Sequence, residues 1–278
     1  MIVSVVAVTE LLSGALIVTL ECCDRPPSSS YSIMKIQDCV ALVTGSNRGL
    51  GLAYCEGLLG AGAAKVYAAA RDVSKIGIRD SRVMPIALDV TSVADVISAA
   101  HSCQDVSLLV NNAGVLRDSP MLGAQSEWAA RREMETNYFA VLSMVQRFAP
   151  VLAKNGGGAI VNVLSVASWF ASPFIATYCA SKAAEEVLTD AIRVQLRSQR
   201  THVAGVYAGY IDTDMSAHVT SPKTSPSQVV IRTLEGLESG LDRIFADDSA
   251  VYVDQKIRTD RAAFDADVLQ SWEDSHST

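Results

Sequence analysis

The sequence lacks the patterns that mark a metal site or a disulfide framework. Its six cysteines contain no C-x-x-C pair and are too sparse for a small disulfide scaffold. Its four histidines are scattered, and none stands at metal-ligand spacing from another. We therefore expect no metal, and thiols that stay reduced, as in a cytoplasmic protein.

A basic surface for nucleic acid is also missing. The chain has 23 basic and 30 acidic residues and a net charge of −7, which makes a polyanion an unfavourable partner. No internal repeat is evident in its 278 residues, of which 49% are hydrophobic and 19% charged. This length and composition fit one α/β domain of the larger kind.

The first 33 residues lack the flanking charges of a signal peptide or a membrane anchor. Glu10 interrupts the apolar run of residues 1–20, and no basic residue precedes position 25. A secretory signal needs a basic start, and a carboxylate inside a membrane span is costly. Three interpretations stay open: a targeting signal, an anchor that contacts a membrane, and an extension before a domain that begins at Met34. We favour the extension (1–33), with residues 34–278 as one Rossmann-type domain.

A glycine-rich turn stands between an apolar run and a helical segment. Residues 40–43 (VALV) have the character of a buried parallel strand, and TGSNRGLG follows them. Gly45, Gly49 and Gly51 would allow tight turning and close backbone approach, while amides at the helix start would receive a pyrophosphate. A glycine loop without a ligand is the alternative, but the position between a strand and a helix favours a dinucleotide site.

The end of the second expected strand, KVYAAARD, bears on which dinucleotide binds. An NAD site carries a carboxylate there for the ribose diol, whereas this strand ends in Ala70 followed by Arg71. Together with Arg48 of the glycine turn, Arg71 could bind a 2′-phosphate through bidentate hydrogen bonds. Asp72 is a counter-signal, although it falls two positions later and could instead cap the next segment. The pattern predicts NADP(H) rather than NAD(H).

Two further expected strands end in residues suited to a cofactor edge. The strand in MPIALDVTS ends in Asp89. This aspartate could bond the adenine amine, with Val90 beside it, or could simply cap the next helix. The strand in SLLVNNAGV ends in Asn111, Asn112, Ala113 and Gly114, where small residues admit a cofactor and asparagine can tie strands together.

A long helix is predicted over residues 127–152, with Asn137 inside it among mostly apolar neighbours. Such an asparagine is either satisfied locally or loosens the helix and exposes a carbonyl to water. The strand AIVNVLS, another helix and the segment HVAGVYAGYIDTDM follow. Strands that alternate with helices predict a doubly wound parallel sheet, the α/β Rossmann architecture.

The stretch LSVASWFASPFIATYCASK carries the candidate chemistry. Tyr178 and Lys182 stand four apart, so on a helix they share one face. A phenol with a pKa of about 10 is a poor base at neutral pH, but a neighbouring ammonium favours the phenolate. Ser165 lies thirteen positions before Tyr178, at the end of a strand, and could donate a hydrogen bond to a carbonyl oxygen. A surface helix with a snorkelling lysine is the alternative for the Tyr-Lys pair alone.

The helix that carries this pair is predicted from an apolar stripe that neither Gly nor Pro interrupts. The stripe consists of Ala180, Ala183, Ala184, Val187, Leu188, Ala191 and Ile192. A stripe of this kind is typical of a helix that packs against a core.

The motifs and their order along the chain resemble those of the short-chain dehydrogenase/reductase family, over about residues 34–215. The matching motifs are TGSNRGLG, LDV, NNAG, METNY, the serine thirteen residues before a tyrosine, and YCASK. The resemblance implies that Tyr178 is the general acid/base and that Lys182 lowers its pKa and holds the nicotinamide ribose. It also implies that Ser165 polarises the substrate carbonyl and that Asn137 positions a proton-relay water.

Motifs and resemblance together give one expected cofactor-binding set. Its members are Gly45, Asn47, Arg48, Gly49, Leu50, Gly51, Arg71, Asp89, Val90, Asn112, Ala113, Gly114, Tyr178, Lys182, Gly209, Ile211 and Thr213. The implied function is NADP(H)-dependent hydride transfer between nicotinamide and a carbonyl or alcohol, in the direction of ketone or aldehyde reduction. A catalytically silent, dinucleotide-binding redox sensor is the alternative, and it would not need the acid/base residues. The residues leave the substrate open.

Two departures from the family pattern concern the C-terminal part. Ala208-Gly209 replaces the usual Pro-Gly after the sixth strand, and the tail of residues 247–278 lacks the usual Gly-rich seventh strand. That strand often contributes to a tetramer in the family. A monomer or a dimer is therefore as compatible with the sequence as a larger homo-oligomer.

A substrate lid is predicted over residues 212–228, which are rich in Ser, Thr and Pro. Trp169, Phe170 and Phe174 indicate a partly aromatic pocket beside it. Core packing is the alternative for Trp169 and Phe174.

Overall fold

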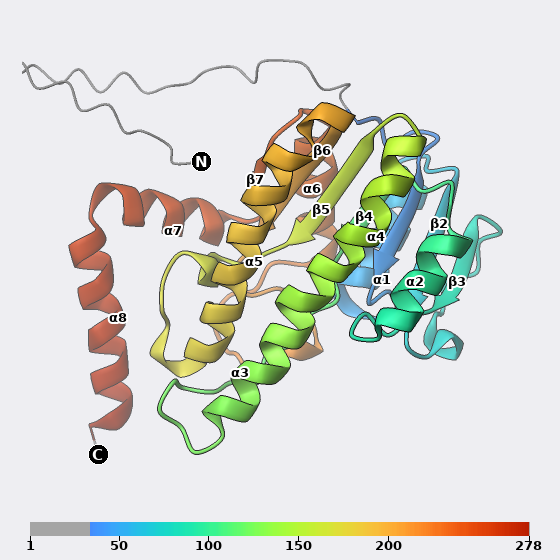
Figure 1. Ribbon diagram of the computed structural model, residues 1–278. Coiled ribbons are helices and arrows are strands. Elements are labelled where there is room, and N and C mark those ends of the chain that lie inside the picture. The colour runs from blue at the N-terminus through green and yellow to red at the C-terminus, as the bar shows by residue number, and fades with distance from the viewer. Residues whose placement is uncertain (1–33, 278) are drawn as a thin grey trace, which may run out of the picture.

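The sheet is parallel throughout and has seven strands in the order β3-β2-β1-β4-β5-β6-β7 (Figure 1). The computed structural model describes residues 34–277. The strands are β1 Val40–Thr44, β2 Lys65–Ala70, β3 Val83–Ala87, β4 Leu108–Asn111, β5 Gly158–Val163, β6 Thr201–Tyr207 and β7 Arg243–Phe245. Strands β2 and β3 are added on one side of β1, and the chain then crosses to the other side of β1, where β4 and the later strands are added. This reversal confirms the doubly wound fold and creates a ligand crevice beyond the carboxyl ends of β1 and β4.

Helices cover both faces of the sheet, as Figure 1 shows. They are α1 Gly49–Gly60, α2 Val93–Ser102, α3 Ser126–Met134, α4 Ala140–Lys154, α5 Ala176–Gln195, α6 Pro226–Glu238, α7 Asp248–Thr259 and α8 Arg261–His276. Tyr54 of α1 and Leu237 of α6 belong to the core on one face, whereas Phe148 of α4 and Ile192 of α5 belong to the core on the other. Every residue of β6 is buried, because a parallel strand covered on both faces has no solvent side.

The predicted stripe of α5 does not face the core, although the helix itself is where the sequence predicts it. Leu188 and Ile192 are buried, but Val187 is 71% exposed and Ala180 and Ala191 are exposed. The buried face carries polar side chains instead, among them Thr177, Ser181, Lys182, Glu185 and Thr189. The buried face is therefore mixed: Leu188 and Ile192 pack in the core, while hydrogen bonds such as that from Asn162 to Thr189 join α5 to β5.

The C-terminal part contains a seventh strand, β7, which lies before the tail of residues 247–278 and not within it. Three residues of β7 pair with Gly205, Val206 and Tyr207 of β6. The strand is too short to show a period, so no pattern in the sequence indicated it. The tail itself forms α7 and α8, and α8 lies at the edge of the molecule in Figure 1.

The expected extension of residues 1–33 lies outside the described residues. Within residues 34–277, no helix has the length and apolar character needed to cross a bilayer. The same part of the chain contains no group of three His, Cys, Asp or Glu side chains placed to hold a metal ion. The four cysteines described there are buried and free.

Candidate active site

The glycine turn forms the cradle that the sequence predicts. Gly45 and Gly49 have φ angles of +70° and +54°, a region that side chains strain to enter. A Cβ on Gly51 would lie 2.2 Å from the carbonyl oxygen of Gly45, so only glycine lets α1 approach the turn this closely. Arg48 precedes α1 without capping it through its side chain, which leaves first-turn amides available to an anion. The cradle therefore fits a dinucleotide pyrophosphate.

Hydrogen bonds tie the strand ends beside this cradle together. The Thr44 hydroxyl accepts from the amides of Asn112 and Ala113, each at 3.0 Å, and Asn112 Nδ2 donates to the Thr44 carbonyl at 2.8 Å. Asn111 Nδ2 donates to Asn162 Oδ1 at 2.8 Å and links β4 to β5. The predicted role of asparagine in tying strands is confirmed. A small cavity of about 10 Å³ at this edge is lined by residues that include Val90 and Ala113, which brings two predicted cofactor segments together.

Arg48 and Arg71, predicted to share a 2′-phosphate, are not brought together. The Arg48 guanidinium lies 2.6 Å from Asp214 Oδ2 in the loop after β6, and both side chains are largely exposed. Arg71 is exposed at the end of β2. Burial would raise the pKa of Asp89, but hydrogen bonds from Thr91 and the charge of Arg71 hold it below its ordinary value. Arg48 would have to leave Asp214 to join Arg71 on one phosphate.

The alternatives for the two aspartates after strands β2 and β3 are settled by their partners. Asp72 accepts from the Ser74 amide and caps a short 3₁₀ turn, which is the capping role that the sequence offers for it. Asp89 accepts from the amide and hydroxyl of Thr91, at 2.9 and 2.7 Å. The cap of α2 is Ser92, which accepts from the Asp95 amide, and Asp89 therefore does not cap that helix.

The other predicted cofactor residues lie on the same edge with different exposures. Leu50 is 9% exposed and its side chain belongs to the core, so only its backbone can meet a cofactor. Asn47 is half-buried in the glycine turn. A Cβ on Gly49 would come within 3.3 Å of Thr213, which shows that the loop after β6 reaches the cradle. Ile211 forms a bridge with Thr224 inside that loop.

Ser165, Tyr178 and Lys182 converge at the carboxyl end of β5. Tyr178 and Lys182 occupy the first turns of α5, and Lys182 Nζ lies 5.9 Å from the centre of the Tyr178 ring. Lys182 Nζ donates to the Val163 carbonyl at 2.8 Å and to Glu185 Oε2 at 2.6 Å. The Ser165 hydroxyl accepts from the Ala167 amide at 3.1 Å and hydrogen-bonds to the Tyr178 phenol. The buried pair with Glu185 was not predicted.

The proton affinity of Tyr178 reflects these neighbours. Burial raises the pKa of the phenol, Lys182 lowers it as the resemblance implies, Glu185 raises it, and Ser165 lowers it. The net result is a pKa above the ordinary value, because burial and Glu185 outweigh the two opposing groups. The phenol is therefore protonated at neutral pH, which is the form that can give a proton to a carbonyl oxygen.

Asn137 lies in a π-helical turn, Glu135–Phe139, between α3 and α4. Its Oδ1 accepts from the Val115 amide, and its Nδ2 donates to the Val115 carbonyl and to Ser181 Oγ, each at 2.9 Å. A Cβ on Gly114 would lie 3.3 Å from Asn137 Oδ1 and 3.9 Å from Lys182 Nζ. Its side chain is therefore satisfied locally, within a π-helical turn, and it fixes the loop after β4 against α5.

Aspartates that the sequence analysis did not single out hold the loop after β6. Gly209 donates its amide to Asp247 Oδ2 at 2.8 Å, and Asp247 also accepts from the Ala250 amide at the start of α7. His218 in the predicted lid lies 3.6 Å from Asp118 in the loop after β4. The capping position before α7 was the signal that could have identified Asp247.

The three aromatic residues predicted for the pocket are engaged in packing. Trp169 stacks on Tyr207 with ring centres 4.5 Å apart, as core packing predicts. Two residues of α8 cover the others: Phe264 packs on Phe170, and Trp272 lies 5.2 Å from Phe174. Phe174 remains 38% exposed and is the aromatic side chain among the three with most surface to offer a substrate.

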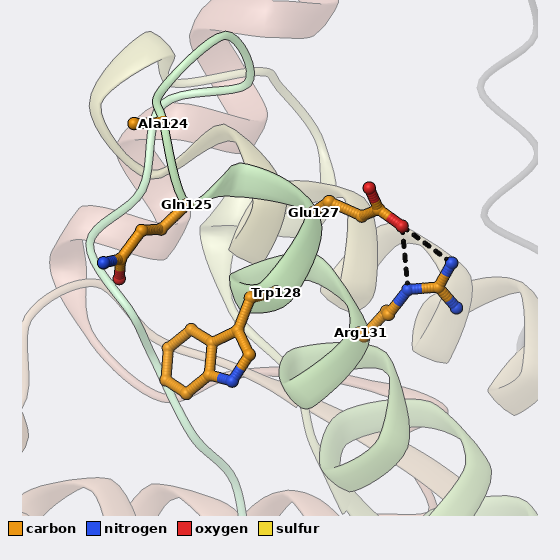
Figure 2. Close-up of a pocket in the computed structure, with 5 residues that line it drawn as sticks. All are labelled: Ala124, Gln125, Glu127, Trp128 and Arg131. Carbon is orange, nitrogen blue, oxygen red and sulfur yellow. Dashed lines mark hydrogen bonds and ion pairs between the residues drawn. The ribbon is translucent and has the colours of Figure 1, made fainter.

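An open depression of about 600 Å³ lies at the first turn of α3, away from these residues (Figure 2). Its lining residues are Ala124, Gln125, Glu127, Trp128 and Arg131. Glu127 and Arg131 pair at 2.8 Å across one turn of the helix, and Trp128 is half exposed. None of the predicted site residues lines it, so the chemistry belongs to the strand edge.

Comparison with known proteins agrees with this geometry. The family described as short chain dehydrogenase matches residues 39–224, more than half of the chain. A short chain dehydrogenase from Burkholderia cenocepacia, solved in complex with NADP, is 43% identical, covers 85% of this chain and 99% of its own, and superimposes with a TM-score of 0.82. Gluconate 5-dehydrogenase of Gluconobacter oxydans is 30% identical over 70% of this chain and 80% of its own.

The chain spans about two thirds of the length of some curated relatives. Dehydrogenase/reductase SDR family member 7B of Xenopus tropicalis is 28% identical over 67% of this chain, and the match spans 65% of that relative. The coverage of the family match, together with the glycine cradle and the Ser-Tyr-Lys arrangement, carries the assignment. The chain belongs to the short-chain dehydrogenase family, whose members are oxidoreductases that act on alcohol or carbonyl groups with a nicotinamide cofactor.

Proposed function

We propose that this protein is an NADP(H)-dependent reductase of ketones or aldehydes. The observation that carries the proposal is the convergence of a protonated Tyr178 with Ser165 and Lys182, beside a glycine cradle. A dinucleotide bound in that cradle would supply the hydride. The chain's own residues would position the carbonyl and provide the proton.

Each side chain has a distinct task in the proposed reaction. Tyr178 gives its phenolic proton to the carbonyl oxygen, and Ser165 donates a hydrogen bond to the same oxygen. Lys182 keeps an ammonium next to the phenol, which favours the phenolate left after proton transfer. Asn137, held by three hydrogen bonds, fixes the backbone around Val115 beside this site.

The preference for NADP(H) rests on charge at the end of β2. Ala70 ends the strand without a carboxylate, and Arg71 follows it in an exposed position. A guanidinium there favours a 2′-phosphate, whereas a ribose diol would find no carboxylate partner. The Burkholderia cenocepacia relative, 43% identical, was solved with NADP, which supports the same preference here.

The test is a pair of titrations of the full chain, with NADPH and with NADH, read by energy transfer from tryptophan to nicotinamide. We expect the dissociation constant for NADPH to be at least about tenfold lower, because one charge-assisted pair is worth about 1.5–3 kcal/mol. Arg71→Ala should remove the difference. Equal affinities in the native protein would refute the preference.

Turnover is tested by oxidation of NADPH with a panel of ketones and aldehydes. Tyr178→Phe should abolish turnover while NADPH still binds, because the ring stays and only the transferable proton is lost. Retained turnover in that variant would refute the role of Tyr178. Binding without turnover of any panel member by the native protein would instead favour the redox sensor.

A further inference from the structure

Glu185 is a buried carboxylate that the proposed reaction does not use. It lies one helical turn after Lys182 and two turns after Tyr178, on the same face of α5. Its side chain is 1% exposed, and its Oε2 lies 2.6 Å from Lys182 Nζ, whose own side chain is 7% exposed. A carboxylate is thus enclosed in direct contact with the ammonium that acts on the candidate acid.

Packing alone does not account for a glutamate at this position. Removing two charges from water costs several kcal/mol, of the order of the attraction that the pair recovers, and apolar residues of similar volume often serve stability equally well. The charge acts instead on its neighbours. Burial lowers the pKa of Lys182, but Glu185 and Tyr178 together raise it above its ordinary value, and Glu185 also raises the pKa of Tyr178.

The groups that face Glu185 limit what can respond to it. Within the described chain, α5 contributes Lys182 and Tyr178 as the charged or titratable groups that interact with it. The hydrogen bonds that β5 makes nearby involve uncharged groups: the Val163 carbonyl accepts from Lys182, and Asn162 donates to Thr189. The titration of this cluster is therefore that of one carboxylate, one ammonium and one phenol.

We propose that Glu185 is a positioning residue that holds the Lys182 ammonium in place and sets the pH above which Tyr178 and Lys182 lose their protons. This role rests on the proposed function, because it defines the alkaline limit of carbonyl reduction by Tyr178. It differs from the role of a catalytic residue, since Glu185 acts through Lys182 and does not touch the reacting carbonyl.

The sign of the effect follows from electrostatics. A nearby anion favours the protonated form of every group around it, so removing the anion lowers the pKa of both Lys182 and Tyr178. Burial raises the pKa of Glu185 to about 7, although Lys182 favours its ionised form. Glu185 is therefore ionised in the alkaline range where Tyr178 loses its proton. In that range, neutralising Glu185 should move the loss of activity to lower pH.

The experiment replaces the charge and follows Tyr178 directly. Glu185→Gln keeps an oxygen that can accept from Lys182 but removes the negative charge. The near-ultraviolet absorbance of tyrosinate is titrated with pH in this variant and in the native chain, each against the same protein carrying Tyr178→Phe, so that the difference reports one phenol. We expect the midpoint to fall by at least about one pH unit, tenfold in proton affinity. The alkaline limb of NADPH-dependent carbonyl reduction should fall by the same amount.

The neighbouring glutamate provides a matched control. Glu186 is on the same helix with a side chain 13% exposed, but it pairs with Arg243 at 3.0 Å and accepts from Trp169. Glu186→Gln should leave the Tyr178 midpoint unchanged. If Glu185→Gln does not fold, Glu185→Leu removes the same charge without an amide to satisfy, and the same shift is expected.

The outcomes separate this inference from the proposed function. A Tyr178 midpoint that is unchanged in a folded Glu185 variant would overturn the inference, even if carbonyl reduction continues. A lowered midpoint in a protein that reduces no carbonyl would support the positioning role and count against the proposed reaction. A uniform loss of activity at every pH, with the same midpoint, would show that Glu185 is only structural and would also overturn the inference.

Discussion

Gly51→Ala is expected to weaken cofactor binding and to destabilise the fold, and the structure indicates the size of both effects. A Cβ at this position would lie 2.2 Å from the Gly45 carbonyl oxygen and 2.6 Å from Asn112 Nδ2. Reaching ordinary van der Waals separation requires the turn to move by about 1 Å, because non-bonded atoms prefer about 3.5–4.0 Å. The obstacle is mainly backbone and cannot rotate away. Overpacking of this kind costs about 1–3 kcal/mol of stability.

The same movement displaces the amides that would hold a pyrophosphate. Hydrogen bonds to charged groups contribute about 1.5–3 kcal/mol each, so losing one should raise the dissociation constant for NADPH at least about tenfold. Titration with NADPH and urea unfolding measure the two effects. Gly60→Ala is the control, because a Cβ there meets nothing within 4 Å at the far end of the same helix. It should leave binding unchanged and stabilise α1 by up to about 1 kcal/mol. Native affinity and stability in Gly51→Ala would refute the reasoning.

Two further predictions concern buried hydrogen bonds and acid stability. Thr189→Val removes the hydroxyl that accepts a hydrogen bond from the buried Asn162 amide at 2.9 Å. It should lower the free energy of unfolding in urea by about 1–3 kcal/mol. An unchanged urea midpoint would mean that water replaces the hydroxyl. The pKa of Asp80 is lowered to about 2 by hydrogen bonds from the Arg82 side chain and amide. A carboxylate whose pKa is lowered in the folded protein stabilises the fold at pH values above its ordinary pKa. This contribution is lost as the pH falls toward 2. Asp80→Asn should therefore lower the melting temperature near neutral pH, and the melting temperature of this variant should fall less steeply than that of the native protein between about pH 4 and pH 2. Parallel plots of melting temperature against pH for the two proteins would contradict this.

Sequence periodicity predicted the sheet well because its strands are nearly continuous apolar runs. Every position of β6 is buried, and β1 and β2 are buried almost throughout, so composition alone marked them as parallel strands covered on both faces. The three residues of β7 carry no such signal, since a strand that short shows no period and its pairing with β6 is set by tertiary contacts.

Periodicity misplaced the buried face of α5 for a physical reason. The pattern counts apolar residues, whereas this face packs on β5 through polar contacts such as Asn162 with Thr189 and Lys182 with the Val163 carbonyl. Apolar residues were left outside, with Val187 71% exposed. Glu185 and Glu186, adjacent in the sequence, look like two surface charges. Spacing does not separate them, because they stand three and four residues after Lys182 and both positions neighbour it on a helix. The structure separates them, since Glu185 pairs with Lys182 whereas Glu186 pairs with Arg243.

Burial of polar groups therefore marks the site more sharply than any single motif. Four polar residues are buried on the side of the fold where the candidate catalytic residues meet. As whole residues they are at most 5% exposed: Asn137, Ser181, Lys182 and Glu185. A core selected only for stability would favour apolar residues there, since buried pairs seldom repay their desolvation. The chain instead holds each of these groups in a hydrogen bond with another polar group, which fixes their orientation before any ligand arrives. Because Tyr178 depends on Lys182, and Lys182 on Glu185, the working pH of the site follows from a residue that never meets the substrate.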